Sequence, residues 1–191
     1  MIFETIVTTV NTAGEAHVTP FGIRLESGMV VISPYKPSTT LQNILATEHA
    51  VLNMCDDVRI FAGALTGYQC WQLLAADKIS GCRVADALAH QELKLVSMQD
   101  DAVRPQLFLK VVHESQHKSF MGFNRAQAAV IELAVLVSRL KRLPMEKIKQ
   151  EITYLQIAID KTAGERELEA WSWLMEAVNN HEAMLDNENL A

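Results

Sequence analysis

The chain changes its sequence periodicity at Gly122, and this change constrains the fold more than any other feature. Before Gly122, short runs rich in Val, Ile and Thr alternate with turn residues, a pattern typical of β-strands. After it, apolar residues recur every three or four positions over long stretches, which is typical of packed helices. We therefore predict an α+β protein with a β-rich domain over residues 1–122 and a helical domain over residues 123–191.

Several segments of the first part have the composition of strands, and they are residues 2–10, 17–25, 29–33, 50–54, 91–98 and 106–113. The first three would form a β-meander, and the last two would be long antiparallel strands. Pro20 would place the second strand at an edge or a bulge, because proline cannot donate a ladder hydrogen bond. Residues 66–89 give no clear pattern.

Helices are predicted from capping residues followed by helical spacing. Ser38 or Thr39 can cap a short helix, and Asp56 or Asp57 can cap another. In the second part, Asn124 is a candidate N-cap for a helix over residues 126–143. Two further helices are expected, one that Pro144 begins and Gly164 ends, and one after it. Together they would form a helical hairpin or a three-helix appendage.

Composition disfavours several classes of function and location. The net charge is −6 and neither part has a basic stripe, so neither nucleic acid nor an anionic membrane is an expected partner. The three cysteines show no CxxC spacing, which fits a reducing compartment better than a disulfide framework. The N-terminal residues lack a positively charged region, and no run of about 18 apolar residues occurs. We therefore expect a cytoplasmic protein without a secretory signal or a membrane span.

The segment from Ser33 to Asn43 is the most informative one for chemistry. It combines the end of a predicted strand, a lysine at position 36, three consecutive hydroxyl residues and the start of a predicted helix. A helix N-terminus presents unsatisfied N–H groups and partial positive charge, which together favour a phosphate group. Lys36 would add a full charge. The alternative is a capped helix with a solvated lysine, because Ser and Thr are common caps.

Short motifs along nearly the whole chain carry a resemblance to a known family. They are ETIVTT at 4–9, HVTPFG at 17–22, PYK at 34–36 with Ser38, Thr40 and Asn43, NMCDDV at 53–58, ADALAH at 85–90, GFNRA at 122–126 and VIE at 130–132. In this order and spacing they resemble a flavin-binding family catalogued as domain of unknown function 447, within the FMN-binding split-barrel superfamily. The resemblance implies a split β-barrel that forms a homodimer and binds FMN between the barrel and the neighbouring subunit.

The resemblance also implies which residues bind the cofactor. Lys36, Ser38 and Thr40, together with Thr39, would hold the phosphate. The β-strand motif of Thr19, Pro20, Phe21 and Gly22 would run along the isoalloxazine ring, Asn53 would lie near the ribityl chain or the ring, and Asn124 and Arg125 could complete the site. Leu41 and Gln91 fall where relatives are expected to carry aromatic residues, so the surface lining the ring would differ here.

An FMN-binding chain of this kind is expected to be a flavin-dependent oxidoreductase. Hydride or electrons would pass through flavin N5, with a nicotinamide nucleotide as one candidate donor and a small molecule as substrate. The resemblance links the substrate to one-carbon or pterin metabolism, and no catalytic residue is predicted. The alternative is a non-catalytic flavin-binding or ligand-sensing dimer whose helices dock a partner, because split barrels support several functions.

A second motif, HESQH at residues 113–117, matches the HExxH pattern of zinc hydrolases. In those enzymes both histidines lie on one face of a helix, and the glutamate acts as a general base. Here the motif follows a strand-like run, so the helical geometry is not expected. We predict no metal site, and a zinc hydrolase acting through His113 and His117 is the least favoured alternative.

Overall fold

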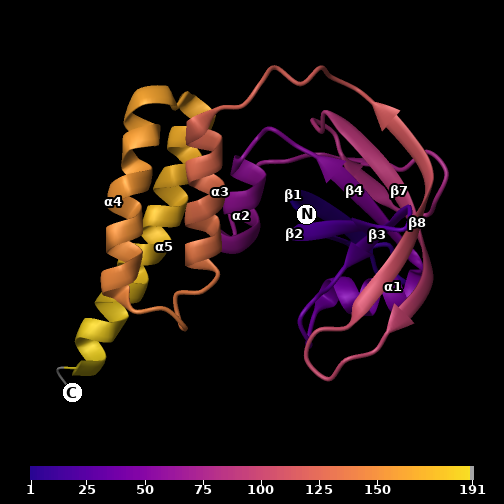
Figure 1. Ribbon diagram of the computed structural model, residues 1–191, viewed down its shortest axis with the longest axis horizontal. Coiled ribbons are helices and arrows are strands. Elements are labelled where there is room, and N and C mark those ends of the chain that lie inside the picture. Colours follow the sequence, from indigo (N-terminus) through magenta and orange to yellow (C-terminus); the bar gives the residue numbers. More distant parts are fainter. Residues whose placement is uncertain (190–191) are drawn as a thin grey trace. The chain divides into compact units, whose positions relative to one another are not determined.

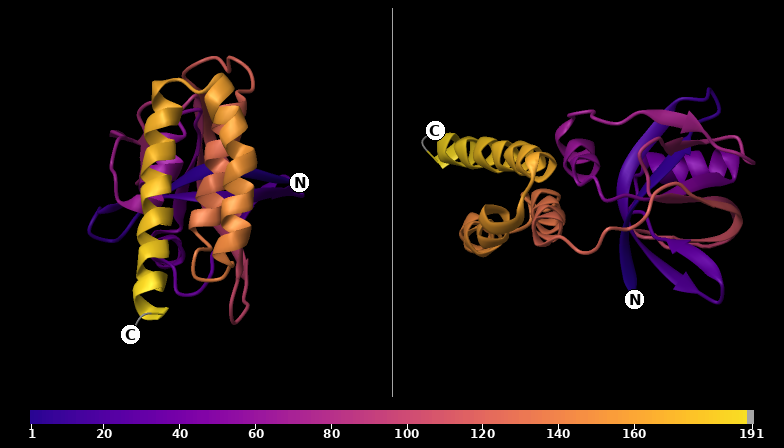
Figure 2. Two further views of the ribbon diagram at one scale, coloured as in Figure 1. Left: turned by 90° about the vertical axis from the view of Figure 1, so that its left-hand side faces the viewer. Right: turned by 90° about the horizontal axis from the view of Figure 1, so that it is seen from above.

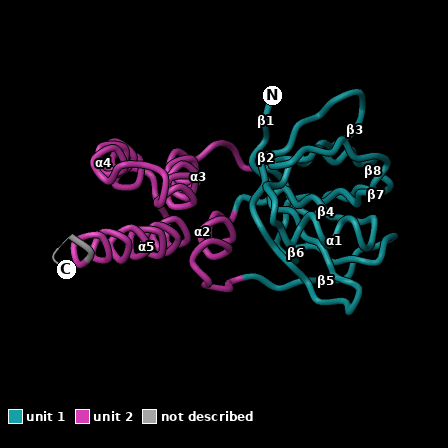
Figure 3. The backbone as a smooth tube through the Cα atoms, turned by 90° about the horizontal axis from the view of Figure 1, so that it is seen from below, with its two compact units in different colours: residues 1–56, 71–120 teal, residues 57–70, 121–191 magenta. Residues whose placement is uncertain are grey.

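The computed structural model describes residues 1–189 and consists of two compact units, shown from three directions in Figures 1 and 2 and in separate colours in Figure 3. Unit 1 contains residues 1–56 and 71–120, and unit 2 contains residues 57–70 and the chain from residue 121 onward. Unit 2 therefore takes a short segment from the middle of the β-rich region. The domain boundary expected at residue 122 therefore stays a prediction.

Unit 1 is a closed antiparallel barrel with the strand order β1-β2-β3-β8-β7-β4 (Figure 1). Its strands are β1 (Ile2–Val10), β2 (Ala16–Glu26), β3 (Met29–Ile32), β4 (His49–Met54), β7 (Ala89–Gln99) and β8 (Gln106–Gln116). Each lies where a strand is predicted, and β1–β3 form the predicted meander. The predicted α+β class is confirmed.

The barrel closes around branched aliphatic side chains contributed by alternate strand positions. Helix α1 (Thr39–Thr47) joins β3 to β4 and adds Leu41 and Ile44 to this core. Burying one such side chain stabilises a fold by about 1.5–3 kcal/mol. The buried members of the core are Val7, Ile23, Val30, Ile32, Leu41, Ile44, Ala50, Leu52, Leu93, Leu107 and Leu109.

A small hairpin that the sequence did not predict is attached to the barrel. Its strands are β5 (Leu73–Ala75) and β6 (Cys82–Val84), and they pair antiparallel. The side-chain oxygen of Asn53 on β4 accepts the N–H of Val84 at 2.8 Å, and the hydroxyl of Thr8 on β1 donates to the carbonyl of Cys82. These two side chains hold β6 against the barrel.

Unit 2 consists of α2 (Arg59–Thr66), α3 (Arg125–Val137), α4 (Met145–Thr162) and α5 (Glu165–Asn189). Figure 2 shows the three longer helices running alongside one another. Val58 and Ala62, from the segment that precedes and forms α2, are buried with Ala126, Leu133 and other residues of α3–α5. No helix within residues 1–189 is both long and apolar enough to cross a membrane.

The ends of two helices differ from the prediction. Helix α3 ends at Val137 and not at Leu143. Here the hydroxyl of Ser138 donates to the carbonyl of Val135, and the following residues form turns instead of helix. Helix α2 begins after Val58, and the predicted cap Asp57 accepts the N–H of Arg59 at 3.1 Å from just outside the helix.

Candidate functional site

The segment between β3 and α1 carries the predicted phosphate-binding residues. Ser38 is the N-cap of α1, as predicted, and its hydroxyl accepts the N–H of Leu41 at 3.3 Å. Thr39 and Thr40 are the first helical residues, of which Thr39 is exposed and Thr40 buried. The N–H groups of a first helical turn have no intrahelical acceptor, and they lie at the positive end of the helix dipole. The segment can therefore accept an anion.

Lys36 lies in the same segment and is exposed. Its ammonium is 2.7 Å from Oδ1 of Asp100, which follows β7, and this pairing lowers the pKa of Asp100. The backbone N–H of Lys36 donates to the carbonyl of Val103 at 2.8 Å, which fixes the position of the lysine. Exposed ion pairs contribute little to stability. The ammonium can therefore turn from Asp100 to a more highly charged phosphate.

Ser33, at the end of β3, has a buried hydroxyl that forms no hydrogen bond with any residue of the described chain. Its backbone carbonyl accepts Nε of Arg104 at 3.0 Å, and the guanidinium carbon lies 4.9 Å from the ring centre of Tyr35. A buried hydroxyl without a partner costs about 1–3 kcal/mol.

The predicted flavin-facing motif lies on β2, where Thr19, Pro20, Phe21 and Gly22 are all half-buried. Pro20 is opposite Ile6 of β1, and Ile6 is opposite Asn53 of β4. The register therefore brings the β2 motif and Asn53 into one row across three strands. A Cβ at position 22 would lie 2.9 Å from Cγ2 of Ile2, so only glycine fits there without rearrangement.

Asn53 is fully buried, and protein atoms occupy its polar groups. Its Nδ2 donates to the carbonyl of Ile6 and the hydroxyl of Thr8, both at 3.2 Å, while its Oδ1 accepts the N–H of Val84. Asn53 therefore joins β1, β4 and β6. A contact between Asn53 and a flavin stays a prediction.

Asn124 and Arg125 lie in unit 2, whereas the other predicted cofactor residues lie in unit 1. Asn124 is the N-cap of α3, as predicted, and its Oδ1 accepts the N–H groups of Ala126 and Gln127 at 2.7 and 3.3 Å. Arg125 is exposed in the first turn. Their role in binding a cofactor stays a prediction.

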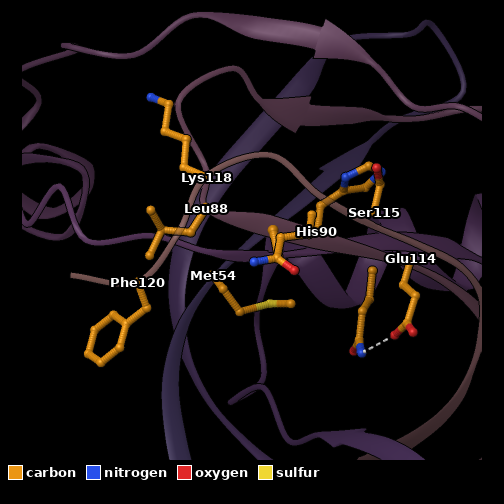
Figure 4. Close-up of a pocket in the computed structure, with 10 residues that line it drawn as sticks. Met54, Leu88, His90, Glu114, Ser115, Lys118 and Phe120 are labelled. Atoms are coloured by element: carbon orange, nitrogen blue, oxygen red, sulfur yellow. Dashed lines mark hydrogen bonds between the residues drawn. The ribbon is translucent and has the colours of Figure 1, made fainter. Parts of the chain in front are cut away.

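A cavity of about 550 Å³ lies in unit 1, beside the end of β4 and over the paired residues at the start of β7 and the end of β8 (Figure 4). Nε2 of Gln91 donates to Oε2 of Glu114 at 3.2 Å within it. The row of Pro20, Ile6 and Asn53 continues to His90 and Ser115, which also line the cavity. The full lining is Met54, Leu88, Ala89, His90, Gln91, Glu114, Ser115, Gln116, Lys118 and Phe120. Its apolar surface with one carboxylate and one ammonium suits a small polar molecule.

The HESQH motif lies on β8 and just beyond its end, so it lacks the helical geometry of a zinc hydrolase. Its two histidines nevertheless gather around His90 of β7. The ring of His117 stacks on that of His90 with centres 5.1 Å apart, and Nε2 of His117 is 2.9 Å from Nδ1 of His90. The His113 ring meets the His90 ring edge-on at 5.9 Å. Burial lowers the pKa of His117.

Glu92 is fully buried two residues after His90 on β7. Its carboxylate accepts the backbone N–H groups of Asp77, Lys78 and Ile79 from the loop between β5 and β6. Burial raises the pKa of Glu92, but these hydrogen bonds outweigh that effect and leave the pKa below its ordinary value. Glu92 is a buried ionisable residue that the sequence analysis did not single out.

The family model described as "Protein of unknown function (DUF447) N-terminal domain" matches residues 3–118, and the one described as "Protein of unknown function (DUF447)" matches residues 124–176. None of the curated proteins matches the chain.

Solved structures share the fold. An FMN-bound protein of the same family from Methanosarcina mazei superposes with a TM-score of 0.79 at 19% identity, covering 92% of this chain and 94% of that one. The 2-nitrobenzoate 2-nitroreductase of Pseudomonas fluorescens has a TM-score of 0.52 at 24% identity, covering 60% and 64%. A Shewanella frigidimarina protein with a split barrel domain has a TM-score of 0.54 at 13% identity, covering 65% and 74%. These matches confirm the predicted split β-barrel with C-terminal helices.

Proposed function

The chain belongs to the DUF447 family, and we propose that it binds FMN and acts as a flavin-dependent oxidoreductase on a small molecule. The observation that carries the proposal is the exposed ammonium of Lys36 close to the N-terminus of α1. The N-terminus of α1, with Ser38, Thr39 and Thr40, follows directly. The similar Methanosarcina mazei protein is FMN-bound, which supports FMN as the ligand.

The donor set of this segment fits a phosphate monoester. Such a group carries close to two negative charges at neutral pH and accepts hydrogen bonds through its oxygens. Lys36 would pair with its charge, while the hydroxyls of Ser38 and Thr39 and the N–H groups of the α1 first turn would donate to its oxygens. Thr40 is buried, so its contribution would come from its backbone N–H.

The remaining site residues would position the ring. The β2 motif from Thr19 to Gly22 offers half-buried backbone along the barrel. The cavity lined by His90 and Ser115, which continue the same strand row, would hold the substrate. Bound FMN would supply hydride or electron transfer, while the protein orients the reactants and limits access of water.

Four finer statements belong to the same proposal. The chain would form a homodimer, since Ile2 and Phe3 on β1 are 62% and 44% exposed and such apolar positions are often covered by a partner. A nicotinamide nucleotide would donate hydride, and the substrate would be a small molecule such as a pterin. The protein would work in the cytoplasm, where its three cysteines remain reduced.

Comparing FMN with riboflavin tests the phosphate site, because riboflavin lacks only the phosphate. We expect the flavin-free protein to bind FMN at least about tenfold more tightly than riboflavin, since a charge-assisted hydrogen bond is worth about 1.5–3 kcal/mol. K36A should reduce this preference without weakening riboflavin binding. K110A, which removes an exposed lysine from β8, is the matched control. Equal affinity for both flavins, or no binding of either, would refute the proposal.

A second assay separates an oxidoreductase from a flavin-binding module without catalysis. NADH or NADPH is added anaerobically to the FMN complex, and the flavin absorbance is followed before and after candidate substrates are added. Reduction followed by reoxidation that depends on a substrate supports an enzyme. A flavin that stays oxidised with both nucleotides favours the non-catalytic alternative.

A further inference from the structure

We propose that Asp77, His90, Glu92 and His113 form a binding site for one divalent transition-metal ion, best suited to Zn²⁺. Asp77 lies in the loop between β5 and β6, His90 and Glu92 lie on β7, and His113 lies on β8. The site is confined to unit 1 and does not depend on flavin binding.

The register of the sheet explains why these residues meet. Side chains two positions apart on a strand point to the same face, so His90 and Glu92 share one face of β7. His113 is directly opposite Glu92 on β8. The loop that contains Asp77 is held over this face because its N–H groups at residues 77–79 donate to the Glu92 carboxylate.

The distances between the donor atoms fit a single ion. One ligand atom from each of the four residues lies within 4.8 Å of all the others. Oδ2 of Asp77 is 3.2 Å from Nε2 of His113 and 3.7 Å from Nε2 of His90, and the latter is 3.4 Å from Oε1 of Glu92. In a tetrahedral zinc site with bonds of about 2.0–2.1 Å, neighbouring ligand atoms are about 3.3–3.4 Å apart. The observed separations bracket this value.

The types of donor select the class of metal. Two imidazole nitrogens and two carboxylate oxygens suit Zn²⁺ and neighbouring first-row ions, whereas Mg²⁺ and Ca²⁺ prefer oxygen ligands throughout. The charges also balance, because one divalent cation neutralises Asp77 and Glu92 when both histidines are neutral. This matters for Glu92, which would otherwise be a fully buried anion.

Neighbouring groups orient two of the ligands. Nδ1 of His90 is within hydrogen-bond distance of Nε2 of His117, so a proton on Nδ1 leaves Nε2 as a lone pair directed at the ion. Glu92 keeps capacity for a metal, since each carboxylate oxygen has two lone pairs and Oε1 accepts a single backbone N–H, from Asp77.

The burial pattern indicates a structural site with a route of entry. His90 and Glu92 are fully buried, while the side chains of His113 and Asp77 are 28% and 50% exposed. An ion can enter past Asp77 and is then surrounded by four protein ligands, as in structural zinc sites. The bound ion would fasten the loop between β5 and β6 to β7 and β8. This differs from HExxH zinc hydrolases, because Glu114 and His117 are not ligands.

Metal titration of the full-length protein tests the proposal. The protein is treated with a chelator, dialysed and titrated with Zn²⁺ against a chromogenic competitor, and with Co²⁺ by visible absorbance. We expect one ion per chain, and at least about tenfold weaker binding for D77N and for H113Q. H49Q removes another half-buried histidine of unit 1 and should bind like the wild type.

Amide hydrogen exchange gives a readout that needs no variant. Zn²⁺ should slow exchange of the Lys78 and Ile79 amides, because their acceptor Glu92 becomes fixed by the ion. The proposal is overturned if the wild type binds no stoichiometric ion, or if D77N and H113Q bind as tightly as the wild type. It is equally overturned if the ion leaves the exchange of these two amides unchanged. Flavin binding is measured separately, so either proposal can fail alone.

Discussion

Replacing Asn53 with alanine should destabilise unit 1 by about 2–4 kcal/mol. In the wild type, the N–H of the buried Val84 donates to Oδ1 of Asn53 at 2.8 Å. In the variant this N–H has lost its acceptor. An unpaired buried donor costs about 1–3 kcal/mol, and loss of the bonds from Nδ2 to Ile6 and Thr8 adds about 1 kcal/mol. The destabilisation should come with faster hydrogen exchange at Val84, because β6 loses its attachment to β4.

Urea denaturation at fixed pH, with the slope compared between variants, measures the loss of free energy. N43A is the matched control, since Asn43 is also buried and its amide donates to the hydroxyl of Thr9. We expect about 1 kcal/mol for N43A, because a hydroxyl can reorient to another partner. An N53A protein as stable as the wild type, with Val84 still protected, would refute a structural role for Asn53.

Three further changes test other parts of the structure. Burial lowers the pKa of His17 in the folded protein, so the unfolded chain binds a proton on this histidine more readily. The free energy of unfolding should therefore fall as the pH drops below about 6.5. H17Q should show a smaller shift of the urea midpoint between pH 7.5 and 5, and an unchanged shift would contradict this. L133A removes a fully buried side chain of α3 and should cost about 2–5 kcal/mol by thermal or urea unfolding, whereas L168A, at an exposed position, should cost under about 1 kcal/mol. D57A removes the acceptor of the Arg59 N–H and guanidinium and should cost about 1–3 kcal/mol, while a loss as small as that of D186A would show that the pair is dispensable.

Several barrel strands could be predicted because their β-branched residues follow one another closely enough to show the pattern locally. Strand β1 and strand β3 are examples, with their runs of Ile, Val and Thr. The β5–β6 hairpin could not be predicted, since each of its strands has three residues. Its position depends on Asn53 and Thr8, which are distant in sequence.

The end of α3 shows what apolar spacing does and does not report. The spacing continues to Leu140 and Leu143, and both side chains do pack against the core of unit 2. They do so from turns that follow the end of the helix at Val137. Apolar spacing therefore predicts burial here, but it does not report where the helix ends.

The two candidate sites also differ in how far the sequence could predict them. The Ser38 cap could be predicted because a hydroxyl residue before a helix acts within four positions of the chain. The cluster around Glu92 could not, because it requires the β7–β8 register and a loop from the segment without a pattern. The alternation of His90 and Glu92 was the one local sign that two ionisable side chains share a strand face.

The interleaving of the two units along the chain has a consequence for biosynthesis. Residues 57–70 leave the ribosome long before α3 and α5, with which Val58 and Ala62 are buried. Until α3 and α5 have been synthesised, Val58 and Ala62 lack the side chains that bury them. Unit 2 therefore completes its core only after most of the chain has been made. A proteolytic cut near residue 121 would therefore not release two self-sufficient domains, because it separates α2 from its packing partners and leaves an apolar surface on the N-terminal fragment.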